Sequence, residues 1–184
     1  MLQFWYTGAD KYNESQPDKD KSLGGFKSSS PVPNDVVSNI IGEVSEYGIY
    51  NNFTDTHAII IENVSGTTMT DVKTYFNDTA TNKYLKTFIA VVELTENTSC
   101  SPTTYSMEKI PNSRSKPTFA TFHEPTSQAT EVVIGDIPAG KMLGVWIRSE
   151  LVDGLKDLTT CDNLLENGPD QENRENIEWV FNWT

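Results

Sequence analysis

Apolar and polar residues alternate in short runs along most of this chain, which is the pattern of β-strands that bury one face. In the run at 69–76, Val72, Thr74 and Phe76 would share one face, and Lys73 and Tyr75 the other. Clusters of Asn, Asp, Gly, Ser and Thr separate the runs and predict turns. The pattern predicts about nine strands, at 48–51, 57–62, 69–76, 87–95, 103–109, 118–123, 130–134, 141–148 and 176–183.

Strands at this spacing predict a mainly β fold, with an immunoglobulin-like antiparallel β-sandwich over residues 47–184. Pro138 and Gly140 suit a turn between two of these strands, because Pro presets φ and Gly accepts the positive φ of a type II turn. Residues 151–170 interrupt the strand pattern, and we expect a helical or looped insertion there.

The first 46 residues have a different pattern, which predicts an extended N-terminal arm followed by a short helix. Two apolar clusters, at 4–6 and 23–26, interrupt an otherwise polar segment. Pro31 and Pro33 force extended backbone, and Asn34 can cap the helix after them. The apolar positions of that helix recur at helical spacing and are Val36, Val37, Ile40, Ile41 and Val44.

An arm this polar buries too little apolar surface to offset the entropy lost when it becomes ordered. We therefore expect a partner surface to hold it, with the two apolar clusters as the anchors. The residues expected to bind that partner are Phe4, Trp5, Tyr6, Leu23, Gly24, Gly25 and Phe26.

Composition narrows the classes of partner. The formal net charge is −12, which argues against direct binding of nucleic acid, since phosphate binding needs clustered Lys and Arg. No apolar run is long enough to span a membrane, and the first residues lack the pattern of a signal peptide. The sequence thus predicts a protein made in the cytoplasm, without a membrane partner, in which Cys100 and Cys161 are free thiols.

No pattern of catalytic or metal-binding residues emerges. The histidines are His57 and His123, both in predicted strands, and no serine or cysteine lies in a recognisable nucleophile motif. The run that begins at Asp18 has the first alternate oxygen ligands of a calcium loop, but Leu23 replaces the required Gly and Ser29 the final Glu. We therefore expect no enzyme activity, no cofactor and no metal.

Two stretches near the N-terminus, Tyr6-Thr7-Gly8-Ala9 and the run from Lys21 through Ser29 to Pro31-Val32-Pro33-Asn34, form a combined motif. This motif resembles the opening of virion structural proteins from tailed bacteriophages, notably the crAss-like phages of gut bacteria. The later stretch at 137–148, a Pro-x-Gly turn followed by an apolar strand, is similar to part of their immunoglobulin-like modules.

The resemblance implies a non-enzymatic structural component of a bacteriophage virion, assembled in the bacterial host cytoplasm. Such a protein would be a multicopy building block at the neck or tail ring, or on the head surface. Its partners would be other virion proteins, such as portal, ring, tail or capsid proteins, together with symmetry-related copies of itself in a homo-oligomer.

A carbohydrate-binding or adhesin module is the alternative from another class. A shallow exposed patch of two or three aromatic residues flanked by Asn and Asp would favour it. Trp5, Trp146, Trp179 and Trp183 could form such a patch, although core or interface positions are the simpler expectation for them.

Overall fold

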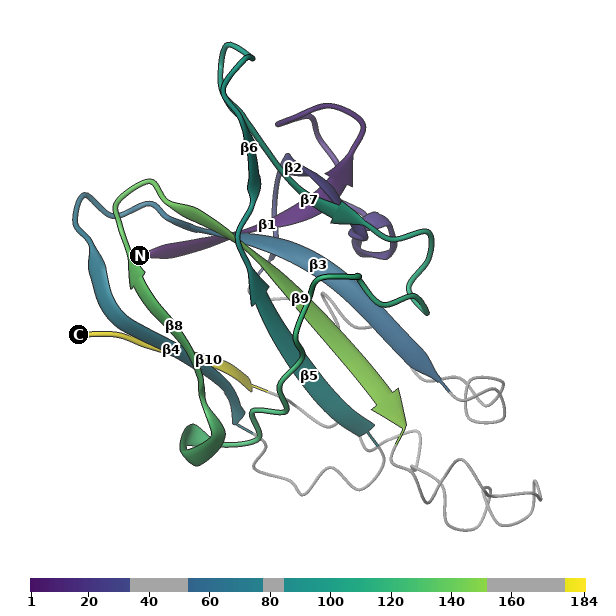
Figure 1. Ribbon diagram of the computed structural model, residues 1–184, viewed down its shortest axis with the longest axis vertical. Helices are drawn as coiled ribbons and strands as arrows, with labels where there is room; N and C mark the ends of the chain where they lie inside the picture. Colours follow the sequence, from purple (N-terminus) through teal and green to yellow (C-terminus); the bar gives the residue numbers. More distant parts are fainter. Residues whose placement is uncertain (34–52, 78–84, 152–177) are drawn as a thin grey trace.

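The computed structural model describes residues 1–33, 53–77, 85–151 and 178–184 and shows a mainly β fold (Figure 1). Its strands form two antiparallel sheets, ordered β5-β9-β3-β1-β2-β7-β6 and β10-β4-β8. Two short 3-10 helices, η1 (Lys19–Lys21) and η2 (Gln128–Thr130), lie between strands. The strands are β1 (Leu2–Ala9), β2 (Gly24–Pro31), β3 (Thr54–Asn63), β4 (Met69–Asn77), β5 (Leu85–Val92), β6 (Thr95–Asn97), β7 (Thr104–Lys109), β8 (Val132–Ile137), β9 (Met142–Leu151) and β10 (Glu178–Asn182).

The larger sheet is curled into a half-barrel. Met107 on β7 and Gly144 on β9 are well separated in the sheet order, yet a Cβ added to Gly144 would lie 3.2 Å from the Met107 Cε atom. Strand β5 at one edge leads directly into β6 at the other through Glu93 and Leu94 (Figure 1). The predicted antiparallel, mainly β class is therefore confirmed, whereas an immunoglobulin-like sandwich is not.

An inner core fills the curl. Trp146, which is only 1% exposed, comes from β9, and the fully buried Ala58 and Ile60 come from β3. Leu23 and Phe122, which are half-buried, pack against this cluster from loops. The inner core thus joins strands from both halves of the curled sheet, and its buried members are Ala58, Ile60, Ala90, Met107, Ile110 and Trp146.

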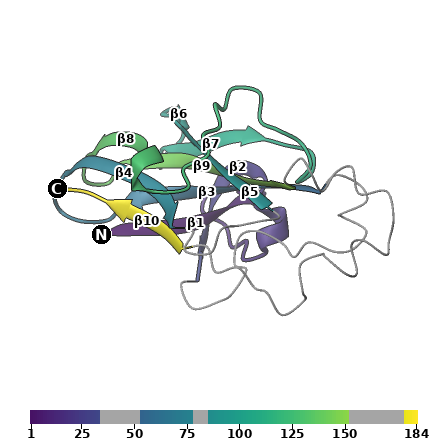
Figure 2. The ribbon, with the colours of Figure 1, turned by 90° about the horizontal axis from the view of Figure 1, so that it is seen from below.

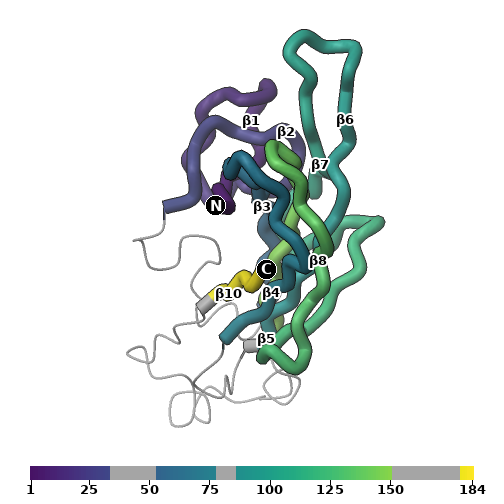
Figure 3. Tube along the Cα trace, turned by 90° about the vertical axis from the view of Figure 1, so that its left-hand side faces the viewer, coloured from purple at the N-terminus to yellow at the C-terminus, as the bar shows by residue number. Residues whose placement is uncertain are grey.

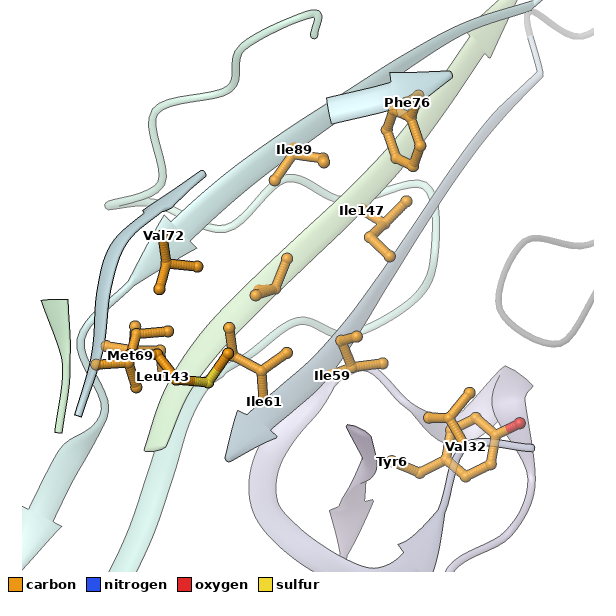
Figure 4. Close-up of a cluster of buried hydrophobic side chains, with 12 residues drawn as sticks. Tyr6, Val32, Ile59, Ile61, Met69, Val72, Phe76, Ile89, Leu143 and Ile147 are labelled. Atoms are coloured by element: carbon orange, nitrogen blue, oxygen red, sulfur yellow. The ribbon is translucent and has the colours of Figure 1, made fainter. Parts of the chain in front are cut away.

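An outer core lies on the opposite face of the larger sheet, against the smaller sheet (Figure 4). Ile59 and Ile61 on β3 face it, whereas Ala58 and Ile60 face the inner core. Strand β3 is therefore covered on both faces, which explains its continuous apolar run. The buried members of this core are Tyr6, Val32, Ile59, Ile61, Met69, Val72, Phe76, Ile89, Ile137, Leu143, Val145 and Ile147.

The smaller sheet lies on the side of the molecule where both chain ends are found (Figures 1 and 2). On β4, Val72, Thr74 and Phe76 are buried, and Lys73 and Tyr75 are half-buried, so the predicted alternation is confirmed. The hairpin of β6 and β7 projects from the rest of the molecule, at the top in the view of Figure 3.

Residues 123–125 link the two sheets. The backbone of His123 exchanges two hydrogen bonds of 2.8 Å with Ile89 on β5, and the Pro125 carbonyl accepts a bond of 2.8 Å from the N–H of Phe76 on β4. The prediction of a strand at 118–123 is wrong, because the isolated bridge between His123 and Ile89 is the only strand-like pairing there. The other predicted strands in the described ranges correspond to β3, β4, β5, β7, β8, β9 and β10, with shifted ends.

The first 33 residues are largely extended, as predicted, but they do not form a separate arm. Strand β1 pairs with both β2 and β3 inside the larger sheet. Trp5 and Tyr6 point to opposite faces of this sheet, and each packs against one of the two cores. The arm therefore finds its support within the same chain. The helix predicted at 34–46, the strand at 48–51, most of the insertion at 151–170 and Cys161 lie outside the described residues.

Candidate functional site

The residues predicted to bind a partner contribute mostly to the fold of this chain. The Phe4 ring lies 5.7 Å from that of Trp179 and 5.4 Å from that of Phe181, across the outer core. Tyr6 belongs to the same core, and Leu23 packs against the inner one. Phe26 is half-buried. Whether any of these side chains also contacts a partner stays a prediction.

Gly24 and Gly25 serve the curl in different ways. Both have a positive φ, of 86° and 82°, which favours glycine. A Cβ on Gly24 would lie 1.8 Å from the Glu108 carbonyl oxygen and 3.0 Å from the Trp146 ring. A Cβ on Gly25 would meet nothing closer than 3.6 Å, at the Lys109 side chain. Gly24 therefore permits close packing of β2 on β7, whereas at Gly25 glycine is favoured only by the positive φ.

The two stretches that carry the phage resemblance meet at one buried corner. Thr7 donates its N–H to the Ser22 hydroxyl at 2.8 Å, and Gly24 donates its N–H to the Thr7 hydroxyl at 3.0 Å. The Ser22 hydroxyl in turn donates to the Ala58 carbonyl on β3. These residues of the resemblance therefore have structural roles.

A cluster of aromatic and charged side chains comes from β1, β2, β3, β7 and the loop after β1, and we call it the aromatic patch: Trp5, Tyr12, Lys27, Glu62 and Tyr105. Trp5 donates its indole N–H to Glu62 at 2.8 Å. The Lys27 ammonium lies 3.9 Å from the centre of the Trp5 ring and 3.9 Å from the Glu62 carboxylate. It is thus held by a cation–π contact and an ion pair.

The two tyrosines extend the patch outward from Glu62. The rings of Tyr12 and Tyr105 lie 6.2 Å apart and are tilted by 50°. Desolvation raises the pKa of Tyr12, and the negative charge of Glu62 adds to this rise. Desolvation also raises the pKa of Tyr105 on β7, and the nearby Glu96 carboxylate contributes to that rise. Both phenols are therefore neutral at ordinary pH.

A second polar cluster lies at the far end of β3 and β9. The buried Arg148 side chain donates to the Thr56 hydroxyl and to the Glu150 carboxylate. On the other face of the sheet, His57 Nε2 lies 3.0 Å from Asp55 Oδ2, while its buried Nδ1 has no hydrogen-bond partner among the described residues. His57 is only 2% exposed, so a reactant in solution has no access to this pair.

Five large apolar side chains of the described residues are exposed, namely Phe119 at 89%, Met1 at 76%, Val133 at 65%, Trp183 at 50% and Val64 at 48%. Phe119 lies in the loop between β7 and η2, and the loop is anchored beside it. Thr118 donates its N–H to both Glu108 carboxylate oxygens, at 2.9 and 2.7 Å, and its hydroxyl to one of them at 2.8 Å. The neighbouring Ala120 packs against the inner core.

Sequence reasoning identifies Trp5 but misses the other members of the aromatic patch. Tyr12 and Tyr105 are 93 positions apart, one in a loop and one on β7, so no local spacing relates them. Among the described residues, no group of three or more His, Cys, Asp or Glu side chains could hold a metal ion. In the same part of the chain, no helix has the length and apolar character needed to cross a bilayer.

Comparison of this chain with known protein families, with curated proteins and with solved structures found no match.

Proposed function

We propose that this protein is a non-enzymatic structural component of a bacteriophage virion, present in many copies and bound to other virion proteins. The resemblance of the N-terminal motif to phage structural proteins motivates the proposal. Thr7, Ser22 and Gly24 of that motif form the buried corner. The residues that resemble phage structural proteins therefore include some that stabilise the fold. A relationship to the immunoglobulin-like modules of those proteins is part of the same proposal, with a place at the neck, tail ring or head surface.

The presentation of Phe119 is the observation that supports a protein-binding role. A phenylalanine that is 89% exposed costs free energy in water, yet the loop that carries it is fixed by three hydrogen bonds to Glu108. Fixed, exposed aromatic side chains are typical anchors of protein interfaces, because little entropy is lost when a partner covers them. Phe119 would be such an anchor in an assembled particle.

Under this proposal a phage encodes the chain, and quantitative mass spectrometry of its purified particles is the test. We expect the protein in the particles at many copies, counted against a capsid protein. Its absence from intact particles, with the protein abundant in the infected cell, would contradict a structural role in the virion.

The Phe119→Ala variant tests the anchor itself. Truncation of a central aromatic anchor typically costs about 2 kcal/mol or more, so incorporation at limiting protein concentration should fall about tenfold or more. The matched control is Thr121→Ala, which changes another exposed side chain of the same loop and should be incorporated normally. Equal incorporation of both variants would move the interface away from this loop.

A further inference from the structure

The aromatic patch, with Asn13 and Glu96 beside it, has the features of a binding site for a small polar ligand. Trp5, Tyr12 and Tyr105 are all half-buried, so each is held by its neighbours while part of its ring surface stays accessible. The Tyr12 and Tyr105 rings are tilted by 50° with centres 6.2 Å apart, and they form a shallow angled platform. An apolar face of this size suits one or two flat, ring-shaped groups.

Unused hydrogen-bonding atoms surround these rings. Glu62 accepts from Trp5 through Oε2, and Glu96 accepts from the Tyr105 hydroxyl through Oε1 at 3.3 Å. Within the described ranges, the second carboxylate oxygen of each has no donor. Asn13 accepts from Lys27 through Oδ1 at 3.4 Å, which leaves its amide N–H groups as donors. The patch therefore offers two acceptors and one donor group around its aromatic surface.

The loop that carries Tyr12 and Asn13 is fixed before any ligand binds. The Asn13 N–H donates to the Lys27 carbonyl at 2.8 Å, and the Ser29 N–H donates to the Glu14 carbonyl at 3.0 Å, so two bonds join the loop to β2. Asn13 itself has a φ of 61°, a turn conformation that Asn tolerates well. A site arranged in advance loses less entropy on binding, which matters most for weak ligands.

We propose that the aromatic patch binds neutral oligosaccharides of hexose units. The apolar face of a hexose ring stacks on aromatic side chains, while its hydroxyl groups donate to carboxylates and accept from an amide. The free atoms of Glu62, Glu96 and Asn13 match this alternation of donors and acceptors. This inference goes beyond the proposed virion role and does not depend on it.

Charge favours neutral over acidic polysaccharides as the ligand. Two carboxylates flank the rings, and two nearby cations are already paired: Lys27 with Glu62, and Lys141 with Glu93 at 2.7 Å. The whole chain carries a formal net charge of −12. An anionic sugar would therefore meet repulsion at the site and over the surface around it.

The shape of the patch favours a sugar over a protein partner. Its rings are half-buried within a cluster, whereas the Phe119 side chain is 89% exposed, as a protein anchor is. A single site of this size would bind weakly. If several copies lie side by side on one particle, binding of a repetitive glycan would be strengthened by multivalency.

Nuclear magnetic resonance titration of the full chain tests the proposal. The probes are cellotetraose, maltotetraose and mannotetraose at about 10 mM, which would fill most of a site with a Kd on the order of 1 mM. Tetragalacturonate serves as the anionic comparison. We expect at least one neutral probe to shift the amide signals of Tyr12, Asn13, Glu96 and Tyr105, and the anionic probe to leave them unchanged. No shift with any neutral probe would overturn the proposal, as would equal shifts with tetragalacturonate.

Variants separate stacking from unspecific effects. Tyr12→Ala and Tyr105→Ala should each weaken binding about tenfold, whereas Tyr12→Phe should keep it, because the ring face remains. Tyr75→Ala, at a half-buried tyrosine on β4 of the smaller sheet, is the matched control and should bind as the original protein does. Signals of residues far from the patch report whether each variant is folded. Unchanged binding by the folded alanine variants would overturn the assignment. A second result would also overturn it: the original protein binds no sugar but self-associates, and the alanine variants no longer self-associate. That result would identify the patch as a protein contact.

Discussion

Thr7 and Ser22 hold each other in the interior although 15 positions separate them in the chain. The Thr7 N–H donates to the Ser22 hydroxyl at 2.8 Å, and the two hydroxyl oxygens lie 3.2 Å apart. Both hydroxyls also donate to one acceptor, the carbonyl of Ala58 on β3. This shared acceptor fixes the positions of β1 and of the loop before β2 against β3.

Replacing Ser22 with Ala should lower the free energy of unfolding by about 1–3 kcal/mol, because the buried Thr7 N–H would lose its acceptor. Urea unfolding followed by tryptophan fluorescence measures this. The control is Ser29→Ala, at an exposed serine of β2, which should change stability by less than about 0.5 kcal/mol. Similar losses in the two variants would mean that the buried corner adds nothing particular to stability.

Three glycine-to-alanine variants should differ in a graded way. Gly24→Ala places a Cβ 1.8 Å from the Glu108 carbonyl oxygen and should cost more than about 4 kcal/mol. Gly25→Ala has room and should cost about 1–2 kcal/mol for its positive φ alone. Gly66→Ala meets nothing within 4 Å and should be close to neutral. Chemical denaturation gives the order, and a Gly25 loss as large as that of Gly24 would contradict this account.

The Phe4 and Phe181 rings should be energetically coupled across the outer core. Their centres lie 5.4 Å apart at a tilted angle, a geometry worth about 0.5–1.5 kcal/mol beyond burial. A double-mutant cycle with alanine at both positions measures this coupling. The comparison cycle pairs Phe4 with Phe122, which packs against the other core, and should be additive within about 0.5 kcal/mol. Additivity in both cycles would show that the ring contact itself contributes nothing.

Stability should depend on pH through Glu150. Burial alone would raise the pKa of its carboxyl, but hydrogen bonds and ion pairs with Arg148 and Lys116 outweigh this and lower the pKa below its ordinary value of 4.5. The native state therefore favours the charged form, and the resulting stability is present above pH 4.5 and lost as pH falls through the lowered pKa.

The Glu150→Gln variant tests this dependence. It should be less stable than the original protein at about pH 7, and the difference should shrink as the pH falls below 4.5. Thermal unfolding at a series of pH values measures it, with the exposed Glu124→Gln as the control that should show no such convergence. A difference that stays constant down to about pH 3 would exclude a role for the Glu150 charge.

Strands with a clear alternation or a continuous apolar run, such as β4 and β3, can be predicted from the sequence, whereas β1 and β2 cannot. Alternation at 69–76 predicts β4 because the smaller sheet has one apolar face. Strand β1 shows no alternation in the sequence, because the adjacent Trp5 and Tyr6 are both apolar and pack against different cores. The sequence therefore predicts it as part of an extended arm. Strand β2 contains Gly, Ser and Pro, which have low strand propensity, and close packing in the curl requires its glycine.

The aromatic patch can be predicted only in part, because tertiary structure alone brings its members together. The apolar cluster at 4–6 identifies Trp5 as an anchor, but its partner Glu62 is 57 positions away. The loop after β1 is bonded to β2, and β2 pairs with β7, so the order of the strands in the sheet brings Tyr12 near Tyr105. The strand pattern contains no information on that order. Spacing therefore gives no reason to join Tyr12 to Tyr105.

The direct passage from β5 to β6 sets a mechanical limit on the half-barrel. Only Glu93 and Leu94 separate the two strands, so the Cα atoms of Val92 and Thr95 can never be more than about 11 Å apart. Because these strands are the two edges of the larger sheet, the sheet cannot unroll without breaking strand pairing elsewhere. The space inside is already occupied by side chains such as Trp146. Among the described residues, the surfaces left for binding another molecule are therefore the outer surface and the rim of the curl.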